Sequence, residues 1–112
     1  MRRHDDQPKR RHMLDHAVEA VEMTRGRTRS DLDTDRQLNL ALVRLVEIVG
    51  EAASRVSGET RERYRDIPWS EIVSLRNRLI HGYDEVDFDI LWEIIQSDLP
   101  RLICRLEEIL DQ

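Results

Sequence analysis

The stretch DRQLNLALVRLVEIVGEAASRV, residues 35–56, decides the fold class of this chain. Its apolar residues recur at alternating steps of four and three, which is the spacing of one buried helix face. They are Leu38, Leu42, Leu45, Val49, Ala52 and Val56, and a second apolar strip of Leu40, Val43 and Val46 lies beside them. A helix that is apolar on more than one side is typical of the centre of a bundle or of a subunit interface. We expect Gly50 and Ala53 to let a neighbouring backbone come close to this helix.

The segment before this helix has the pattern of a second helix and a connecting loop. Apolar residues at helical spacing predict a helix over about residues 8–25, and Gly26 follows as a stop signal. The polar segment 26–34 reads as a loop that delivers Asp33 or Thr34 as the N-cap of the central helix.

After the central helix, capping residues mark two further helical segments. Ser57 or Thr60 begins a short charged turn that ends at Pro68, and residues 69–80 follow as a third helix. Asp87 is a suitable N-cap for a last helix over 88–110.

Pro100 falls within the apolar stripe of that last helix. The stripe continues on both sides of the proline, so we expect a kink or a re-capped break at Asp98 rather than a new direction.

The length and composition set the architecture. With 112 residues, of which 37% are charged and only 4% aromatic, the chain predicts one all-α domain, an up-and-down bundle of four or five helices with an aliphatic core. We place a flexible, arginine-containing arm at residues 1–8 and the helical domain at 9–112. The net charge of −5 argues against a broad positive surface for long nucleic acids, so any site for RNA or phosphate must be local.

The expected location is the cytoplasm. Cys104 is the single cysteine, which excludes an internal disulfide, and no apolar run approaches a signal peptide core or a membrane span.

The stretch RNRLIHGYDEVD, residues 76–87, carries the groups that suggest chemistry. Arg76 lies four residues after Ile72, which puts its guanidinium on or beside the apolar face of the third helix. This position is costly unless the guanidinium is paired or lines a cleft, and a carboxylate such as Glu47 or Glu51 could pair with it. Asn77 lies four residues before His81, so its amide could touch the imidazole.

In an uninterrupted helix, Arg76 and His81 would lie roughly 140° apart and would not converge. A left-handed Gly82 could end the helix around His81 and free its side chain to turn. The alternative is that a second subunit completes the site.

An imidazole, a guanidinium and an amide are the groups needed to cleave RNA by internal transfer, in which histidine moves a proton and arginine stabilises charge on the phosphate. His81 could instead be a histidine at a helix end that bonds a free carbonyl.

Four acids follow the motif and could bind Mg²⁺: Asp84, Glu85, Asp87 and Asp89. Acids at a helix N-terminus are the simpler interpretation, and we expect no metal and no cofactor.

The segment RNRLIHGY, residues 76–83, resembles the Arg-x4-His-x-Tyr signature of the HepT-type toxins, a branch of the HEPN superfamily of small helical proteins. The similarity spans roughly residues 13–110. LVEIVGEAA resembles the second-helix motif of that family, DIPWSEIVSLRNRLIHGY its core, and VDFDILWEIIQSDLP its last helix.

The resemblance implies a homodimeric, metal-independent ribonuclease, with tRNA as the expected substrate class. Arg76 and His81 would be the RNA-cleaving pair and Asn77 the polar residue beside the arginine. The chain would be the toxin of a type VII-like toxin-antitoxin pair, silenced when an MntA-like minimal nucleotidyltransferase attaches AMP to Tyr83. The alternative is a non-catalytic HEPN module that binds a nucleotide or a nucleotidyltransferase partner as a scaffold.

Overall fold

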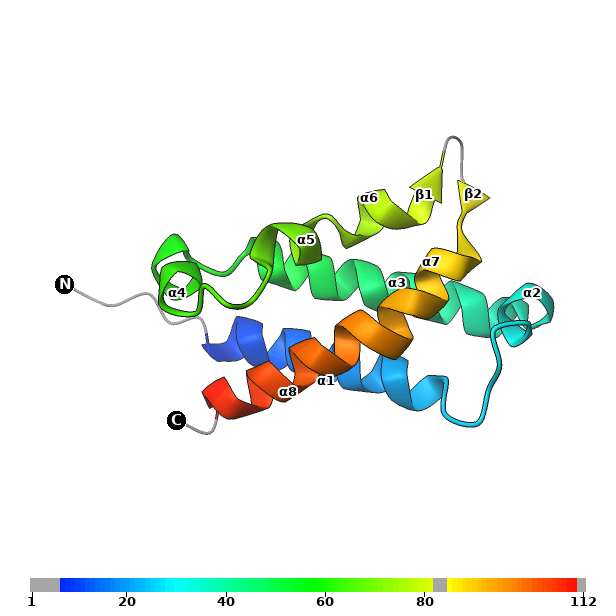
Figure 1. Cartoon of the computed structure of the whole chain (residues 1–112), viewed down its shortest axis with the longest axis horizontal. Coiled ribbons are helices and arrows are strands. Elements are labelled where there is room, and N and C mark those ends of the chain that lie inside the picture. The colour runs from blue at the N-terminus through cyan, green and yellow to red at the C-terminus, as the bar shows by residue number, and fades with distance from the viewer. Residues whose placement is uncertain (1–6, 82–84, 111–112) are drawn as a thin grey trace.

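The computed structural model describes residues 7–81 and 85–110, and these form a bundle whose main helical segments alternate in direction (Figure 1). The segments are α1 (Gln7–Met23), α3 (Arg36–Ser54), the pair α5 (Trp69–Val73) and α6 (Leu75–Leu79), and the run of α7 (Phe88–Glu93), the π-helix η1 (Ile94–Asp98) and α8 (Leu99–Leu110). The short elements are α2 (Asp31–Thr34), α4 (Gly58–Arg63), β1 (Ile80–His81) and β2 (Glu85–Val86). The predicted all-α, up-and-down bundle is therefore confirmed.

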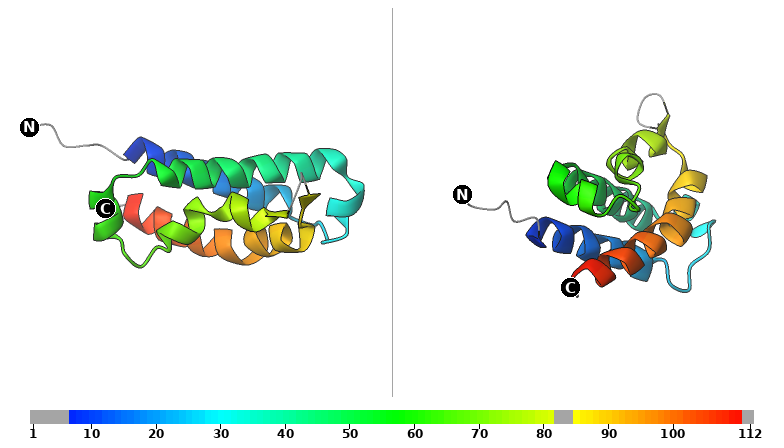
Figure 2. Two further views of the ribbon diagram at one scale, coloured as in Figure 1. Left: turned by 90° about the horizontal axis from the view of Figure 1, so that it is seen from above. Right: turned by 60° about the vertical axis from the view of Figure 1, so that its left-hand side comes forward.

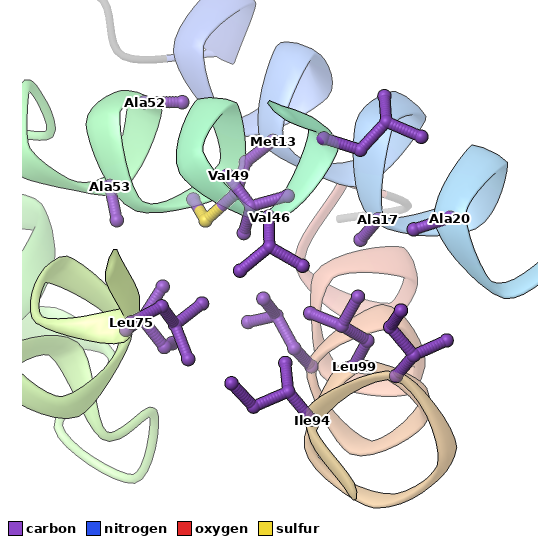
Figure 3. Packing of buried hydrophobic residues seen from close by; sticks show 14 of the residues in the cluster. Met13, Ala17, Ala20, Val46, Val49, Ala52, Ala53, Leu75, Ile94 and Leu99 are labelled. Carbon is purple, nitrogen blue, oxygen red and sulfur yellow. The ribbon is translucent and has the colours of Figure 1, made fainter. Parts of the chain in front are cut away.

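The helix predicted from residues 35–56 is α3, and it lies at the centre of the bundle. α3 packs against α1 on one side and against α5 and α6 on another, while α1 also packs against α8 (Figure 2). Side chains of four helical segments meet in the core, among them Ala17 of α1, Val46 of α3, Leu75 of α6 and Leu99 of α8 (Figure 3). The second apolar strip is only partly buried, because Leu40 is 52% exposed.

The connection between α1 and α3 corrects one prediction. Asp35 is the N-cap of α3, and its carboxylate accepts a hydrogen bond from the backbone N–H of Leu38; neither Asp33 nor Thr34 has this role. Both of those residues belong to α2, a short helix in the segment expected to be a loop. α2 is held in place by the buried Asn39, whose amide donates to the carbonyl of Leu32 at 2.8 Å.

Three predicted boundary signals are confirmed. Gly26 has a φ of +76°, the left-handed conformation that a glycine provides after a helix. Ser57 caps α4 by accepting from the backbone N–H of Thr60. Asp87 caps α7 by accepting from the backbone N–H groups of Asp89 and Ile90. Each of these signals acts within a few residues of its own position, which is why sequence alone locates it.

The prediction of one helix over residues 69–80 is wrong. The chain leaves helical geometry at Ser74, with φ −92° and ψ 9°, and the helix that restarts there ends at Leu79. Ile80 is extended, and β1 pairs with β2 in antiparallel register, with His81 opposite Glu85. The predicted left-handed cap at Gly82 lies outside the described residues.

The run of α7, η1 and α8 continues through Pro100, and the irregularity expected near Asp98 is a π-helix rather than a re-capped break. Residues 94–98 form a π-helix, in which the N–H of Leu99 bonds to the carbonyl of Ile94. This wider turn lies directly before the proline, where the ring would otherwise clash with the carbonyl four residues earlier. Within the part of the chain that the structure describes, none of the helices has an apolar stretch of the length needed for a membrane span.

Candidate active site

A close contact between α3 and α5 determines where the site lies. A Cβ added to Gly50 would be only 2.9 Å from the carbonyl oxygen of Ile72, so the two backbones approach more closely than any side chain at residue 50 would allow. This confirms the expectation for Gly50. The contact places the preceding turn of α3, which carries Glu47, beside the start of α6, which carries Arg76.

Arg76 is bound to Glu47 across this contact. Its Nε donates to Oε2 of Glu47 at 3.0 Å, while the arginine side chain is 64% exposed and the glutamate 22%. Of the two partners predicted for Arg76, the structure therefore selects Glu47 over Glu51.

Of the two positions predicted for Arg76, on or beside the apolar face, the structure selects the second, because the side chain is exposed. The spacing from Ile72 assumed one continuous helix, whereas the break at Ser74 separates the two residues. Within α6 the buried residues are Leu75 and Leu79, and Arg76 follows Leu75 by one residue, or about 100° around the helix.

The ion pair lines an open groove of about 440 Å³ between α3 and the α5–α6 pair. The lining residues are Arg44, Glu47, Gly50, Glu51, Ser54, Val73 and Arg76. Arg44 reaches the other carboxylate oxygen of Glu47, with Nη1 at 3.6 Å from Oε1. The groove thus combines two guanidinium groups with one carboxylate between them. Sequence reasoning missed Arg44, although its position three residues before Glu47 on one helix indicated that the two could pair.

The other predicted site residues lie next to Arg76 in the chain. Asn77 is exposed on α6. The backbone of His81 lies in β1, so the 140° separation expected for a straight helix does not apply to Arg76 and His81. The side chain of His81 and the whole of Tyr83 lie outside what the structure describes, and their roles stay predictions.

The second arginine of the motif serves a different surface. Nη1 of Arg78 donates to Oδ2 of Asp98 at 2.7 Å, which ties α6 to the π-helix. The pair borders a second groove of about 470 Å³, whose apolar lining includes Ile72, Leu75 and Leu102. Arg76 and Arg78 therefore line separate grooves.

Two of the acids after the motif have structural partners. Asp87 caps α7, and Asp89 accepts from Nε of Arg29 at 2.7 Å. Hydrogen bonds from Arg29 to Asp33 and Asp89 raise the pKa of its guanidinium above the ordinary arginine value. Asp84 lies outside the described residues. Among those that the structure does describe, there is no group of three histidine, cysteine, aspartate or glutamate side chains close enough to hold a metal ion.

Three other side chains outside the groove can be placed. Trp69 is a core residue, and its indole N–H donates to the carbonyl of Tyr64 at 3.0 Å. Nδ1 of His16 lies 2.7 Å from the carbonyl oxygen of His12, so this ring bonds its own helix. Cys104, the single cysteine, is exposed.

Comparison with known proteins gives the same family as the motif. The family described as ribonuclease HepT-like matches residues 13–109 of the chain. A relative from Caldanaerobacter subterraneus subsp. tengcongensis, provisionally named an RNase, is 37% identical over 101 residues, which cover 90% of each chain. Another with the same provisional name, from Methanocaldococcus jannaschii, is 33% identical over 95 residues, covering 85% of this chain and 87% of the relative.

A third relative, from Thermococcus cleftensis, carries the provisional name ribonuclease HepT. It is 33% identical over 100 residues, covering 86% of this chain and 91% of its own length. No solved structure matches the chain. The family match covers nearly the whole helical bundle, including α3, α6 and the groove between them. The chain belongs to the HepT-like ribonuclease family.

Proposed function

We propose that this protein is a ribonuclease that cleaves RNA by internal transfer at the groove between α3 and α6. The observation that carries the proposal is the placement of Arg76: it is exposed at the wall of an open groove, and Glu47 holds it through Nε alone among the described contacts. The two terminal nitrogens therefore have donors available for a phosphate. The family description and the names of the relatives support RNA as the substrate.

The proposed reaction uses the groups of the motif and no metal. The 2′-oxygen of the RNA attacks the adjacent phosphorus, and His81 takes the proton of the 2′-hydroxyl. The bond from phosphorus to the 5′-oxygen breaks, the leaving oxygen takes a proton from water, and the product strand ends in a 2′,3′-cyclic phosphate. Arg76 stabilises the negative charge that grows on the phosphate oxygens, and Asn77 orients the pair.

The biological role that we propose follows the family resemblance. The chain acts as the toxin of a toxin-antitoxin pair in the cytoplasm, with tRNA as its substrate class. It works as a homodimer, in which a second subunit completes the site around His81. A minimal nucleotidyltransferase of the MntA type silences it by attaching AMP to Tyr83, which follows His81 by two residues.

The decisive experiment compares wild type with His81→Ala and Arg76→Ala. Expression of wild type without the partner should arrest growth and shorten cellular RNA, and both variants should lose this effect. The purified wild type should also cleave tRNA in the presence of EDTA. Equal toxicity of wild type and His81→Ala would refute the mechanism, whereas intact RNA with all three proteins would favour a non-catalytic module.

The silencing step has its own test. Intact-mass measurement after co-expression with the nucleotidyltransferase should show added AMP, and Tyr83→Phe should not carry it. An adduct that persists on Tyr83→Phe would place the acceptor elsewhere.

A further inference from the structure

We propose that Arg44 is a second phosphate-binding residue of the groove, so that Arg44 and Arg76 together bind neighbouring phosphates of one RNA strand. Glu47 is the positioning residue that holds both. This inference rests on the proposed function and extends it from the scissile phosphate to the strand beside it.

The geometry brings the two guanidinium groups to one carboxylate. Arg44 reaches Glu47 from within α3, three residues earlier on the same helix, while Arg76 reaches it from α6. Each arginine uses a different oxygen of Glu47, with Nη1 of Arg44 at 3.6 Å from Oε1 and Nε of Arg76 at 3.0 Å from Oε2. The two cations therefore flank one carboxylate in the same groove, Arg44 from the α3 side and Arg76 from the α6 side.

The charge and the available donors favour a phosphate ligand. The cluster of Arg44, Glu47 and Arg76 carries +1, whereas the chain as a whole carries −5 and the groove as a whole, with Glu51, is neutral. Both arginine side chains are 64% exposed, and the 3.6 Å separation of Arg44 from Glu47 is too long for a hydrogen bond. Most donors of Arg44 thus face the groove or solvent. Guanidinium groups with free donors suit the paired oxygens of a phosphodiester.

Glu51 limits where the strand can lie. This second acid lines the same groove one turn further along α3 from Glu47, away from Arg44. It repels phosphate, so the strand is favoured at the Arg44 side of the groove. The arrangement predicts that bound phosphates span Arg44 and Arg76 and do not extend past Glu51.

The substitution Glu47→Gln should affect RNA binding and kcat differently, and this difference tests the inference. Replacing its carboxylate by an amide in Glu47→Gln removes a negative charge beside the proposed phosphate site, so RNA binding should stay equal or tighten. The same change releases Arg76 from its 3.0 Å bond, so kcat should fall by about tenfold or more. A residue that only supports the fold would weaken both properties together.

The binding test uses cleavage-dead protein, so that it does not depend on catalysis. In a His81→Ala background, Arg44→Gln should weaken binding of a short fluorescein-labelled single-stranded RNA by about three- to tenfold at low salt. It should also reduce the slope of log affinity against log salt by about 0.7, the loss of one phosphate contact. Arg44→Lys, which keeps the charge, should restore most of the slope.

Arg65→Gln is the matched control. Arg65 is also an exposed arginine beside a glutamate three residues away, with Nη1 at 3.7 Å from Oε1 of Glu62, but it does not line the groove. It should leave the slope unchanged.

Equal effects of Arg44→Gln and Arg65→Gln would overturn the inference while leaving the proposed ribonuclease in place. Failure of the cleavage-dead protein to bind RNA at all would overturn both. In the protein that keeps His81, Arg44→Gln should raise KM with little change in kcat, whereas Arg76→Ala should lower kcat. If Arg44→Gln lowers kcat as much as Arg76→Ala does, Arg44 does not act in binding alone.

Discussion

Gly50→Ala tests the contact that places Glu47 beside Arg76. In the interior of a helix, alanine is favoured over glycine by about 0.5–1 kcal/mol, so propensity alone predicts a more stable protein. The structure predicts the reverse, because the new Cβ would lie 2.9 Å from the carbonyl oxygen of Ile72. That neighbour is backbone and cannot move aside as a flexible side chain would.

The two effects can be compared. Overpacking of a tight contact costs roughly 1–3 kcal/mol, which exceeds the gain in helix propensity. We expect a net loss of about 1–2 kcal/mol in the free energy of unfolding and a fall in Tm of about 5 °C or more, since each kcal/mol shifts the Tm of a domain near this size by roughly 4–8 °C. Thermal unfolding followed by circular dichroism measures both.

The matched control for Gly50→Ala is Gly58→Ala, at the start of α4. A Cβ there meets nothing within 4 Å, so Tm should stay the same or rise slightly. An unchanged or higher Tm for Gly50→Ala would refute the close approach of α3 and α5. RNA cleavage provides a second readout, because moving α3 away from α5 lengthens the 3.0 Å bond between Glu47 and Arg76 and should reduce kcat even in folded protein.

Two further predictions concern parts of the chain outside the groove. Asn39→Ala should lower the free energy of unfolding by about 1–3 kcal/mol, measured by urea denaturation, because it leaves the carbonyl of Leu32 without its buried donor; an unchanged midpoint would contradict this. The hydrogen bond from Arg105 lowers the pKa of Asp66, so its contribution to stability is present above the ordinary aspartate pKa of about 3.9 and is lost as pH falls through the lowered value. The Tm of wild type should therefore exceed that of Asp66→Asn by a small margin at pH 7, and the margin should disappear in acid. A margin that grows in acid would contradict the lowered pKa of Asp66.

The sequence by itself determined the helical segments and several of their ends. The alternating steps of four and three in residues 35–56 predict a helix buried in a bundle. Asp87 was identified as an N-cap from residue type and position, and Ser57 was one of two candidates with Thr60. These signals are local, since a cap satisfies N–H groups only two or three residues away and periodicity is a property of one helix. The motif at residues 76–83 also indicated the family, which the comparisons confirm.

Only the tertiary structure decided how the segments meet. The break at Ser74, the π-helix before Pro100 and the exposure of Arg76 were not predicted from periodicity, because periodicity assumes an uninterrupted helix. The choice of Glu47 over Glu51 depends on how α3 and α6 are aligned across the contact at Gly50. Both acids line the same groove and differ by one turn of α3. Sequence therefore provided the reactive groups, and the packing of two backbones determined which of them share a groove.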